Sequence, residues 1–182
     1  PVISAALGSR THATNKVANL DSEQRVEGSY RNVVKSGGLL AFALGDNTHA
    51  INALGSVEGD VSGNVDISVT AGEVATGTVG ERTVAETYLG SVLADVDGSV
   101  NINVVVGAVN TFAVGFSTGK DIYAKTYVGN VTSRQAGSNI SASTGAIFNL
   151  GLGLVLDLGT LGTLDFSKQG CVMIANQGSA PC

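Results

Sequence analysis

The sequence of 182 residues contains no tryptophan, two prolines, two cysteines and one methionine, and aromatic residues make up only 5% of it. The low proline content argues against a collagen-like or proline-rich chain, and a hydrophobic fraction of 43% argues against intrinsic disorder. Enzymes that act on sugars commonly hold them on exposed aromatic platforms, so the scarcity of aromatic side chains also argues against that class.

Positive charge is also scarce. Ten lysine and arginine residues are scattered along the chain against fifteen acidic ones, which leaves a formal net charge of −5. Nucleic acids and anionic membranes bind clustered basic side chains, so the sequence predicts no nucleic-acid partner. The longest apolar stretch, residues 150–164, is interrupted by glycine, aspartate and threonine, so no membrane insertion is expected.

Glycine and small apolar residues dominate instead, with 25 glycines in the chain. β-Branched side chains favour strands, and glycines favour the tight corners between strands. Segments such as VDISVT (65–70) and VNINVV (100–105) alternate as strands with one buried face do. We therefore expect an all-β protein built from strands and glycine-rich corners.

Residues 31–57, 65–92 and 100–131 share one skeleton of apolar alternation and glycine. Aligning them places Gly38, Gly72 and Gly107 in one column, with spacings of 34 and 35 residues. The repeat also makes His12 equivalent to His49, so the only two histidines are explained by the repeat rather than by a metal or catalytic site. Two further columns hold other repeat glycines: Gly45, Gly80 and Gly115, then Gly55, Gly90 and Gly129.

One repeat of about 35 residues cannot bury its apolar face alone, so neighbouring repeats are expected to stack. We predict a parallel β-solenoid over residues 1–153 with about 4.5 repeats, followed by an apolar C-terminal tail over residues 154–182. The alternatives are an antiparallel sandwich or barrel, and a division of each unit into two coils of about 17 residues. Three pairs are expected to stack in register: Val65 on Val100, Ile67 on Ile102 and Val69 on Val104.

The repeats share short recurring motifs, among them Leu-Gly-Ser-Val at residues 54–57 and 89–92. In this style, residues 1 to about 155 resemble secreted bacterial β-solenoid surface proteins of the filamentous-haemagglutinin kind, although the period here is longer than the coils of that family. The resemblance brings no catalytic residues and implies an exported structural or adhesive protein. The chain begins at Pro1 rather than Met, as expected after removal of a signal peptide.

Candidate chemistry is confined to acidic side chains. Glu58 with Asp60, and Asp95 with Asp97, could serve as the acid and base of a polysaccharide-acting enzyme, but their shared place in a repeat corner favours solvated turns. A calcium ion between stacked Asp60 and Asp95 is the alternative. The sequence contains no nucleophile elbow and no phosphate-binding loop, so we expect neither catalysis nor a cofactor.

The two cysteines, Cys171 and Cys182, both lie in the C-terminal tail. An even count in an exported chain predicts one disulfide that closes a small loop in an oxidising compartment. By the chain-entropy argument, such a loop contributes about 3 kcal/mol to the free energy of unfolding.

The apolar tail and the start of the chain are the predicted assembly elements. A solenoid needs caps at its ends, and we find no amphipathic capping helix in the sequence. We predict that the tail and the N-terminal half-repeat, Val2 to Leu7, meet at a junction between subunits; the competing explanation is that the tail caps its own solenoid. The interface leucines of the tail are Leu150, Leu152, Leu154, Leu156, Leu158, Leu161 and Leu164.

These features predict a non-enzymatic structural subunit of an extracellular β-rich filament or surface fibre, which assembles with copies of itself head to tail. The first alternative is a surface adhesin that binds glycans or the cell surface, and the second is a β-solenoid enzyme that acts on polysaccharide. A third is an ice-binding solenoid with a threonine column formed by Thr48, Thr83 and Thr118.

Overall fold

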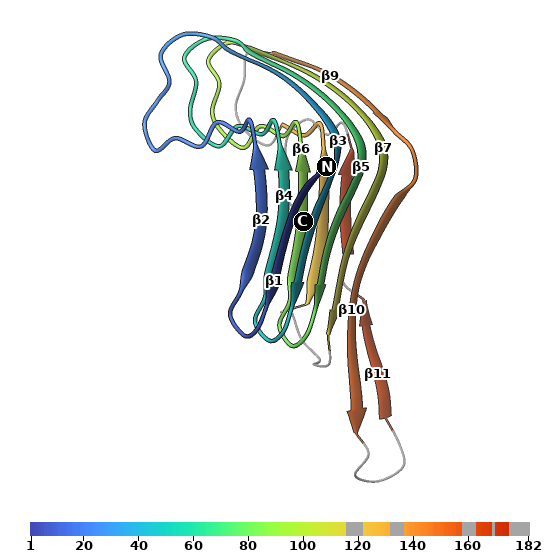
Figure 1. Ribbon diagram of the computed structural model, residues 1–182. Coiled ribbons are helices and arrows are strands. Elements are labelled where there is room, and N and C mark those ends of the chain that lie inside the picture. The colour runs from blue at the N-terminus through green and yellow to red at the C-terminus, as the bar shows by residue number, and fades with distance from the viewer. Residues whose placement is uncertain (116–121, 132–136, 158–162, 169, 175–182) are drawn as a thin grey trace.

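The computed structural model describes residues 1–115, 122–131, 137–157, 163–168 and 170–174. It is an all-β structure whose parallel sheets stack as a β-solenoid of about four turns (Figure 1). Within these ranges no helix is long and apolar enough to span a membrane. The strands are β1 (Val2–Leu7), β2 (His12–Val17), β3 (Tyr30–Leu44), β4 (His49–Leu54), β5 (Val65–Val79), β6 (Val84–Leu89), β7 (Ser99–Gly115), β8 (Tyr123–Val128), β9 (Gly137–Thr144), β10 (Ile147–Asp157), β11 (Thr163–Lys168) and β12 (Gly170–Ile174).

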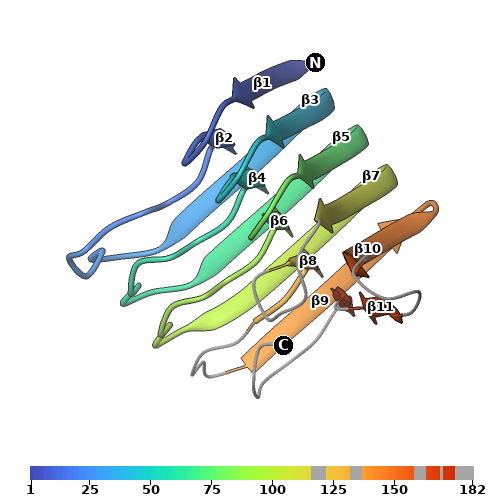
Figure 2. The same cartoon turned by 90° about the horizontal axis from the view of Figure 1, so that it is seen from below.

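Two sheets run along the solenoid. The first has the strand order β1-β3-β5-β7-β10-β11, with β9 also paired to β7, and the second has the order β12-β8-β6-β4-β2. Successive coils pair in parallel, and Figure 2 shows them stacked from β1 and β2 at one end to β9 and β10 at the other. The predicted parallel solenoid is therefore confirmed, and the antiparallel sandwich or barrel is wrong. Two coils per unit is also wrong, because strands pair with their equivalents one full repeat away.

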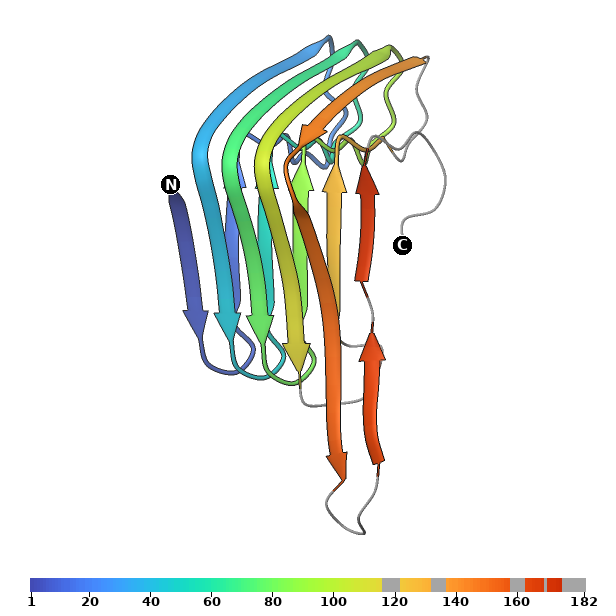
Figure 3. The same ribbon diagram turned by 90° about the vertical axis from the view of Figure 1, so that its right-hand side faces the viewer.

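Each complete coil contains one long strand, a tight turn, a short strand and a polar corner. The long strand bends once, which divides it into an upper arm and a lower arm, and Figure 3 shows this bend repeated from coil to coil. The upper arms are residues 30–36, 65–71 and 99–106, and the lower arms are residues 38–44, 73–79 and 108–115. In the last coil β9 forms the upper arm and β10 continues as the lower arm.

The wide part of the interior lies under the upper arms and is filled with β-branched side chains. Three interior positions of β5 pair with their equivalents in β7: Val65 with Val100, Ile67 with Ile102 and Val69 with Val104. All six side chains are at most 3% exposed. The predicted in-register stacking is therefore confirmed, and burial of each such side chain contributes about 1.5–3 kcal/mol.

The narrow part of the interior lies between the lower arms and the short strands, where small alanines surround a buried chain of hydrogen bonds. Asn15 Nδ2 donates to Asn52 Oδ1 over 2.9 Å, and Asn52 Nδ2 donates to the first of four linked threonine hydroxyls over 2.8 Å. Asn149 Nδ2 donates to the last hydroxyl over 2.9 Å. This polar spine runs from β2 to β10, and its threonines are, in order, Thr76, Thr87, Thr111 and Thr126.

A glycine lies at each described bend of the long strand, and from the second bend onwards no side chain fits there; at Gly37 a Cβ atom would meet no atom within 4 Å. The predicted alignment of Gly38 with Gly72 is wrong by one residue, because Gly38 pairs with Glu73. A Cβ atom at Gly72 would lie only 2.1 Å from the carbonyl oxygen of Gly37, so the two backbones approach too closely for any side chain. The bend column therefore consists of Gly37, Gly72, Gly107 and Gly145.

A second glycine column lies where each short strand enters its corner. Gly55, Gly90 and Gly129 have φ angles of 66°, 59° and 62°, in the left-handed region that side chains disfavour. The column is thus explained by backbone conformation. In the first coil the equivalent residue is Ala18, which adopts a φ of 52° despite its side chain.

Candidate assembly site

The first coil leaves strand edges open. Among the described strands, β1 pairs only with β3, and β2 pairs only with β4. β1 carries no charged residue, and an uncharged, unpaired edge is a template for another strand. Val2, at 39% exposed, belongs to the interior column that ends here, whereas Leu7, at 74% exposed, lies on the outer face beside Leu44. The two predicted N-terminal interface residues therefore face different surfaces.

The last coil leaves edges open as well. In the described part of the chain, β9 pairs only with β7, and β12 pairs only with β8. β12 carries no charge, and its Val172 and Ile174 are 44% and 45% exposed. β10 pairs with β7 as far as Gly153 and with β11 from Leu152 onwards, so the β10–β11 hairpin projects beyond the coils (Figure 3).

The predicted interface leucines of the tail fall into three groups. The β10–β11 hairpin contains Leu154, Leu156 and Leu164. Two more, Leu150 and Leu152, lie half-buried on the lower arm of β10. The remaining two, Leu158 and Leu161, lie outside the described residues. The two described strands of the tail thus pair with each other within the chain. Their contact with another copy stays a prediction.

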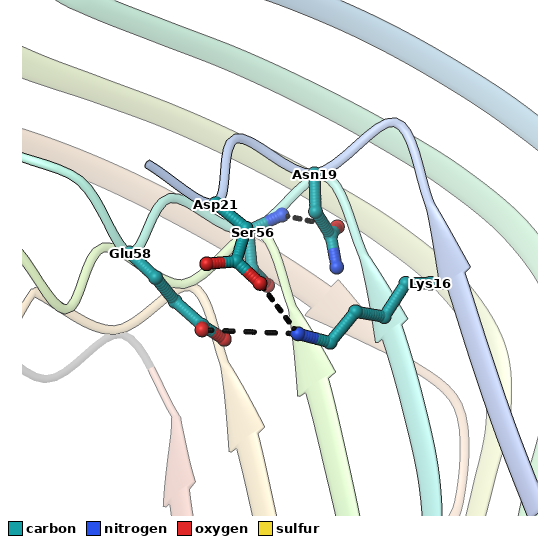
Figure 4. A network of polar contacts seen from close by, with 5 residues as sticks. All are labelled: Lys16, Asn19, Asp21, Ser56 and Glu58. Carbon is teal, nitrogen blue, oxygen red and sulfur yellow. Dashed lines mark hydrogen bonds and ion pairs between the residues drawn. The ribbon is translucent and has the colours of Figure 1, made fainter. Parts of the chain in front are cut away.

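The positive charge of Lys16, the one lysine of the open strand β2, is balanced by carboxylates from the first two coils. Lys16 Nζ lies 2.9 Å from a carboxylate oxygen of Asp21 and 3.9 Å from one of Glu58 in the next coil (Figure 4). The hydrogen bond to Asp21 outweighs the opposing effect of burial and, with both carboxylate charges, raises the pKa of Lys16 above its usual value. In the same corner Asn19 Oδ1 accepts a 2.9 Å hydrogen bond from the Ser56 amide. These contacts hold the first coil to the second.

The outer face of the lower arms is apolar, a feature that the sequence analysis missed. Ile3, Leu40, Leu44 and Phe148 are exposed on it by 64%, 40%, 43% and 51%. The sequence indicates this face through the run LLAFAL at residues 39–44, in which both the inward and the outward positions of the strand are apolar. This apolar lower face has three columns, each crossing β1, β3, β5, β7 and β10: Ile3, Leu40, Ala75, Asn110 and Phe148; Ala5, Phe42, Gly77, Phe112 and Leu150; Leu7, Leu44, Val79, Val114 and Leu152.

The outer face of the upper arms is polar, although it belongs to the same sheet. A groove of about 510 Å³ crosses it, and the side chains that line it include Arg31, Asp66, Asn101 and Asn139 from four successive coils. Asn101 Nδ2 donates to Asp66 Oδ1 over 2.8 Å. Rows of amide, carboxylate and guanidinium groups can exchange hydrogen bonds with hydroxyl-rich ligands.

A charged cluster lies on the outer face of the short strands. One carboxylate oxygen of Glu86 lies 3.0 Å from His49 Nε2, and the other lies 3.6 Å from Lys125 Nζ. Burial raises the pKa of Glu86, but the hydrogen bond with His49 and the nearby positive charges outweigh it and bring the pKa below its usual value. The rings of Tyr88 and Tyr127 stack beside it at 5.2 Å, and burial followed by the charge of Glu86 raises the pKa of Tyr88. The cluster therefore links three successive coils.

The carboxylate pairs singled out in the sequence have structural partners. Asp60 Oδ1 accepts a 3.0 Å hydrogen bond from the Asp95 amide, so these stacked residues brace consecutive corners. Glu58 forms the ion pair described above, and Asp97 forms one with Arg25 from the first coil. The described residues include no group of three His, Cys, Asp or Glu side chains that could hold a metal ion.

The repeat alignment of the two histidines is confirmed, because His12 pairs with His49 across coils and their ring centroids lie 5.9 Å apart. Thr48 and Thr83 are only 2% and 0% exposed, and Thr118 lies outside the described residues. An ice-binding surface must be exposed, so the two described threonines do not form one.

Cys171 lies half-buried on β12, and its backbone carbonyl accepts a 3.0 Å hydrogen bond from Asn149 Nδ2. Its predicted disulfide partner, Cys182, lies outside the described residues, so the disulfide stays a prediction.

Comparison of the chain with protein-family models, curated proteins and solved structures finds no match. The open ends, the apolar lower face and the polar groove are therefore the surfaces from which a function can be inferred.

Proposed function

We propose that this protein is a structural subunit of an extracellular β-rich filament or surface fibre, and that it assembles with copies of itself head to tail. The observation that carries the proposal is that both ends of the solenoid expose edges of the same two parallel sheets. β1 at one end and β12 at the other carry no charged residue. Because such edges pair readily with another strand, stacking along the solenoid axis satisfies both ends at once.

The repeat predicts the register of this junction. Residues 13–17 of one copy continue the ladder formed by residues 170–174 of its neighbour, and residues 2–6 likewise follow residues 147–151, since β11 pairs with β10 from Leu152 onwards. Lys16 of one copy then follows Met173 of the other in a single column on the outer face of the short strands.

The repeat style supports an extracellular location. It resembles that of secreted bacterial surface proteins of the filamentous-haemagglutinin kind, and the predicted disulfide between Cys171 and Cys182 belongs in an oxidising compartment. Intact-mass measurement of the native protein under non-reducing conditions tests the second point. Two thiols open to alkylation in the folded, unreduced protein contradict it.

The polar groove favours one further candidate function, binding of a glycan by a surface adhesin. Its rows of polar side chains, which include Asp66 and Asn101, follow the solenoid axis over four coils, as an extended polysaccharide would. A glycan array probed with the native protein tests this candidate. Asp66→Ala should abolish any binding that depends on the groove, and unchanged binding contradicts the assignment of the ligand to this surface.

Negative-stain electron microscopy and sedimentation of the native protein test head-to-tail assembly directly. Met173→Lys places a charge on the open edge of β12 and in the column of Lys16 of the next copy, so it should shorten or abolish the filaments, whereas the apolar control Met173→Leu should preserve them. Equal effects of both substitutions contradict the predicted register. A native protein that remains a single-sized particle at high concentration contradicts filament formation itself.

A further inference from the structure

One long strand presents two different outer faces to solvent. In β3 the outward residues of the upper arm include Arg31 and Lys35, whereas those of the lower arm are Leu40, Phe42 and Leu44. Strands that are apolar on both faces normally lie between two layers of protein. The apolar lower face is thus covered on its inner side by the solenoid and lacks an outer layer among the described residues.

The dimensions of the face fit a protein interface. With five strands about 4.8 Å apart and six residues of about 3.3 Å each, its projected area is roughly 470 Å² per copy. Two such faces together cover about 950 Å², which is close to the roughly 1,000 Å² that a specific interface needs. The three columns include no charged side chain, and the acidic residue that borders them, Glu73, accepts a 3.0 Å hydrogen bond from Asn110 Nδ2 within the chain.

The face is also complementary to itself. A hollow of about 350 Å³ lies at its N-terminal side, lined by the apolar residues Ile3, Leu40 and Ala75 and bordered by Pro1 and Glu73. Phe148, 51% exposed, lies at the other end of the same column. A two-fold axis parallel to the strands reverses the order of the coils, and it therefore brings Phe148 of one copy to the hollow of the other.

We infer that the apolar lower face binds the same face of a second copy of this chain through this two-fold axis. The inference deepens the proposed function, since head-to-tail stacking makes the columns that end at Phe148 and Leu150 continuous and allows two solenoid stacks of opposite direction to pair along them. The axis also places Leu44 of one copy opposite Val114 of the other. Within one chain these residues are separated by Val79, so their contact is specific to lateral pairing.

Lateral pairing is tested in the Met173→Lys background, which blocks the proposed ends. This variant should be a dimer by native mass spectrometry and by sedimentation. Adding Leu44→Lys should halve the mass, and so should Val114→Glu, because each places an unpaired charge in the apolar interface. An equimolar mixture of the two doubly substituted chains should form a heterodimer. Val33→Lys, on the polar upper arm of the same strand, is the matched control and should leave the dimer intact.

Several outcomes would overturn the inference: a monomeric Met173→Lys variant, a dimer that survives Leu44→Lys, or a mixture of charge variants that stays monomeric. Circular dichroism verifies that every variant retains its β structure. Binding of a monomeric protein to phosphatidylcholine vesicles would likewise overturn it by assigning the face to lipid. If the native protein forms dimers but no filaments, the lateral inference stands and the head-to-tail proposal fails.

Discussion

The rings of Phe42 and Phe112 approach each other to 6.3 Å across Gly77, although one complete coil separates the two residues. The approach is feasible because Gly77 has no side chain, and a Cβ atom there would lie 2.3 Å from Cζ of Phe112. The two rings thereby close the gap that the glycine leaves in the middle column of the apolar lower face.

This relationship gives Gly77→Ala a mild expected effect. The ring of Phe112 is only partly buried and can swing outward, so the free energy of unfolding should fall by about 1 kcal/mol. Gly72→Ala is the contrasting variant, because its new Cβ would meet the carbonyl oxygen of Gly37 at 2.1 Å and backbone cannot move aside. Urea unfolding should show a loss of about 3 kcal/mol or more for Gly72→Ala. Similar losses in both variants would contradict this account of the bend.

Ala18→Gly should stabilise the first coil. Ala18 has a φ of 52° at a position where the other coils carry glycine, and a left-handed backbone costs a side-chain-bearing residue roughly 1–2 kcal/mol. Part of that gain is offset by the greater freedom of glycine in the unfolded chain, so a net increase of up to about 1 kcal/mol is expected.

Gly90→Ala is the reciprocal control for Ala18→Gly. Gly90 has a φ of 59°, and a Cβ there would lie 2.8 Å from Cγ2 of Val104. The midpoint of urea denaturation should rise for Ala18→Gly and fall for Gly90→Ala. Shifts of the same sign would show that the shared backbone conformation does not determine the residue at this corner.

The polar spine predicts opposite results for two buried threonines. Thr87 Oγ1 lies 2.7 Å from Thr76 Oγ1 and 2.8 Å from Thr111 Oγ1, so Thr87→Val breaks the chain of hydrogen bonds and should cost about 1–3 kcal/mol. Thr78 is equally buried, but its hydroxyl has no hydrogen-bond partner among the described residues. Thr78→Val should therefore be neutral or stabilising in thermal unfolding. A larger loss for Thr78→Val than for Thr87→Val would contradict the stabilising role of the spine.

Glu86 should make the stability of the protein dependent on acid pH. Its pKa in the folded protein is lower than the ordinary value of 4.5, so its ionised form stabilises the fold above that value. The contribution is lost as the pH falls through the lower, folded-state pKa. Comparison of unfolding for the wild type and Glu86→Gln between pH 6 and about pH 3 should show a stability difference that shrinks toward acid. A difference that is constant across this range would contradict it.

The stacking of Val65 on Val100 could be predicted because a parallel solenoid relates consecutive coils by a translation of one repeat, so residues one period apart must lie side by side. The bend was located only to within one residue. Gly37 and Gly38 are adjacent and chemically identical, and the difference between them is the close approach of Gly72 to the carbonyl of Gly37, which exists only in the folded chain.

The sequence by itself determined the all-β class, the length of the repeat and the equivalence of residues such as His12 and His49, because these depend on composition and on the period of the chain. An antiparallel meander could have the same period, so the tertiary structure decided that the repeats pair in parallel. Tertiary structure alone decided which side of the LLAFAL strand faces solvent, since a run that is apolar at every position has no periodicity to distinguish its two faces. It also decided the partners of the polar spine. Thr87 and Thr111 belong to different columns on opposite sheets, and they meet only because the narrow interior brings those sheets within reach of a hydrogen bond.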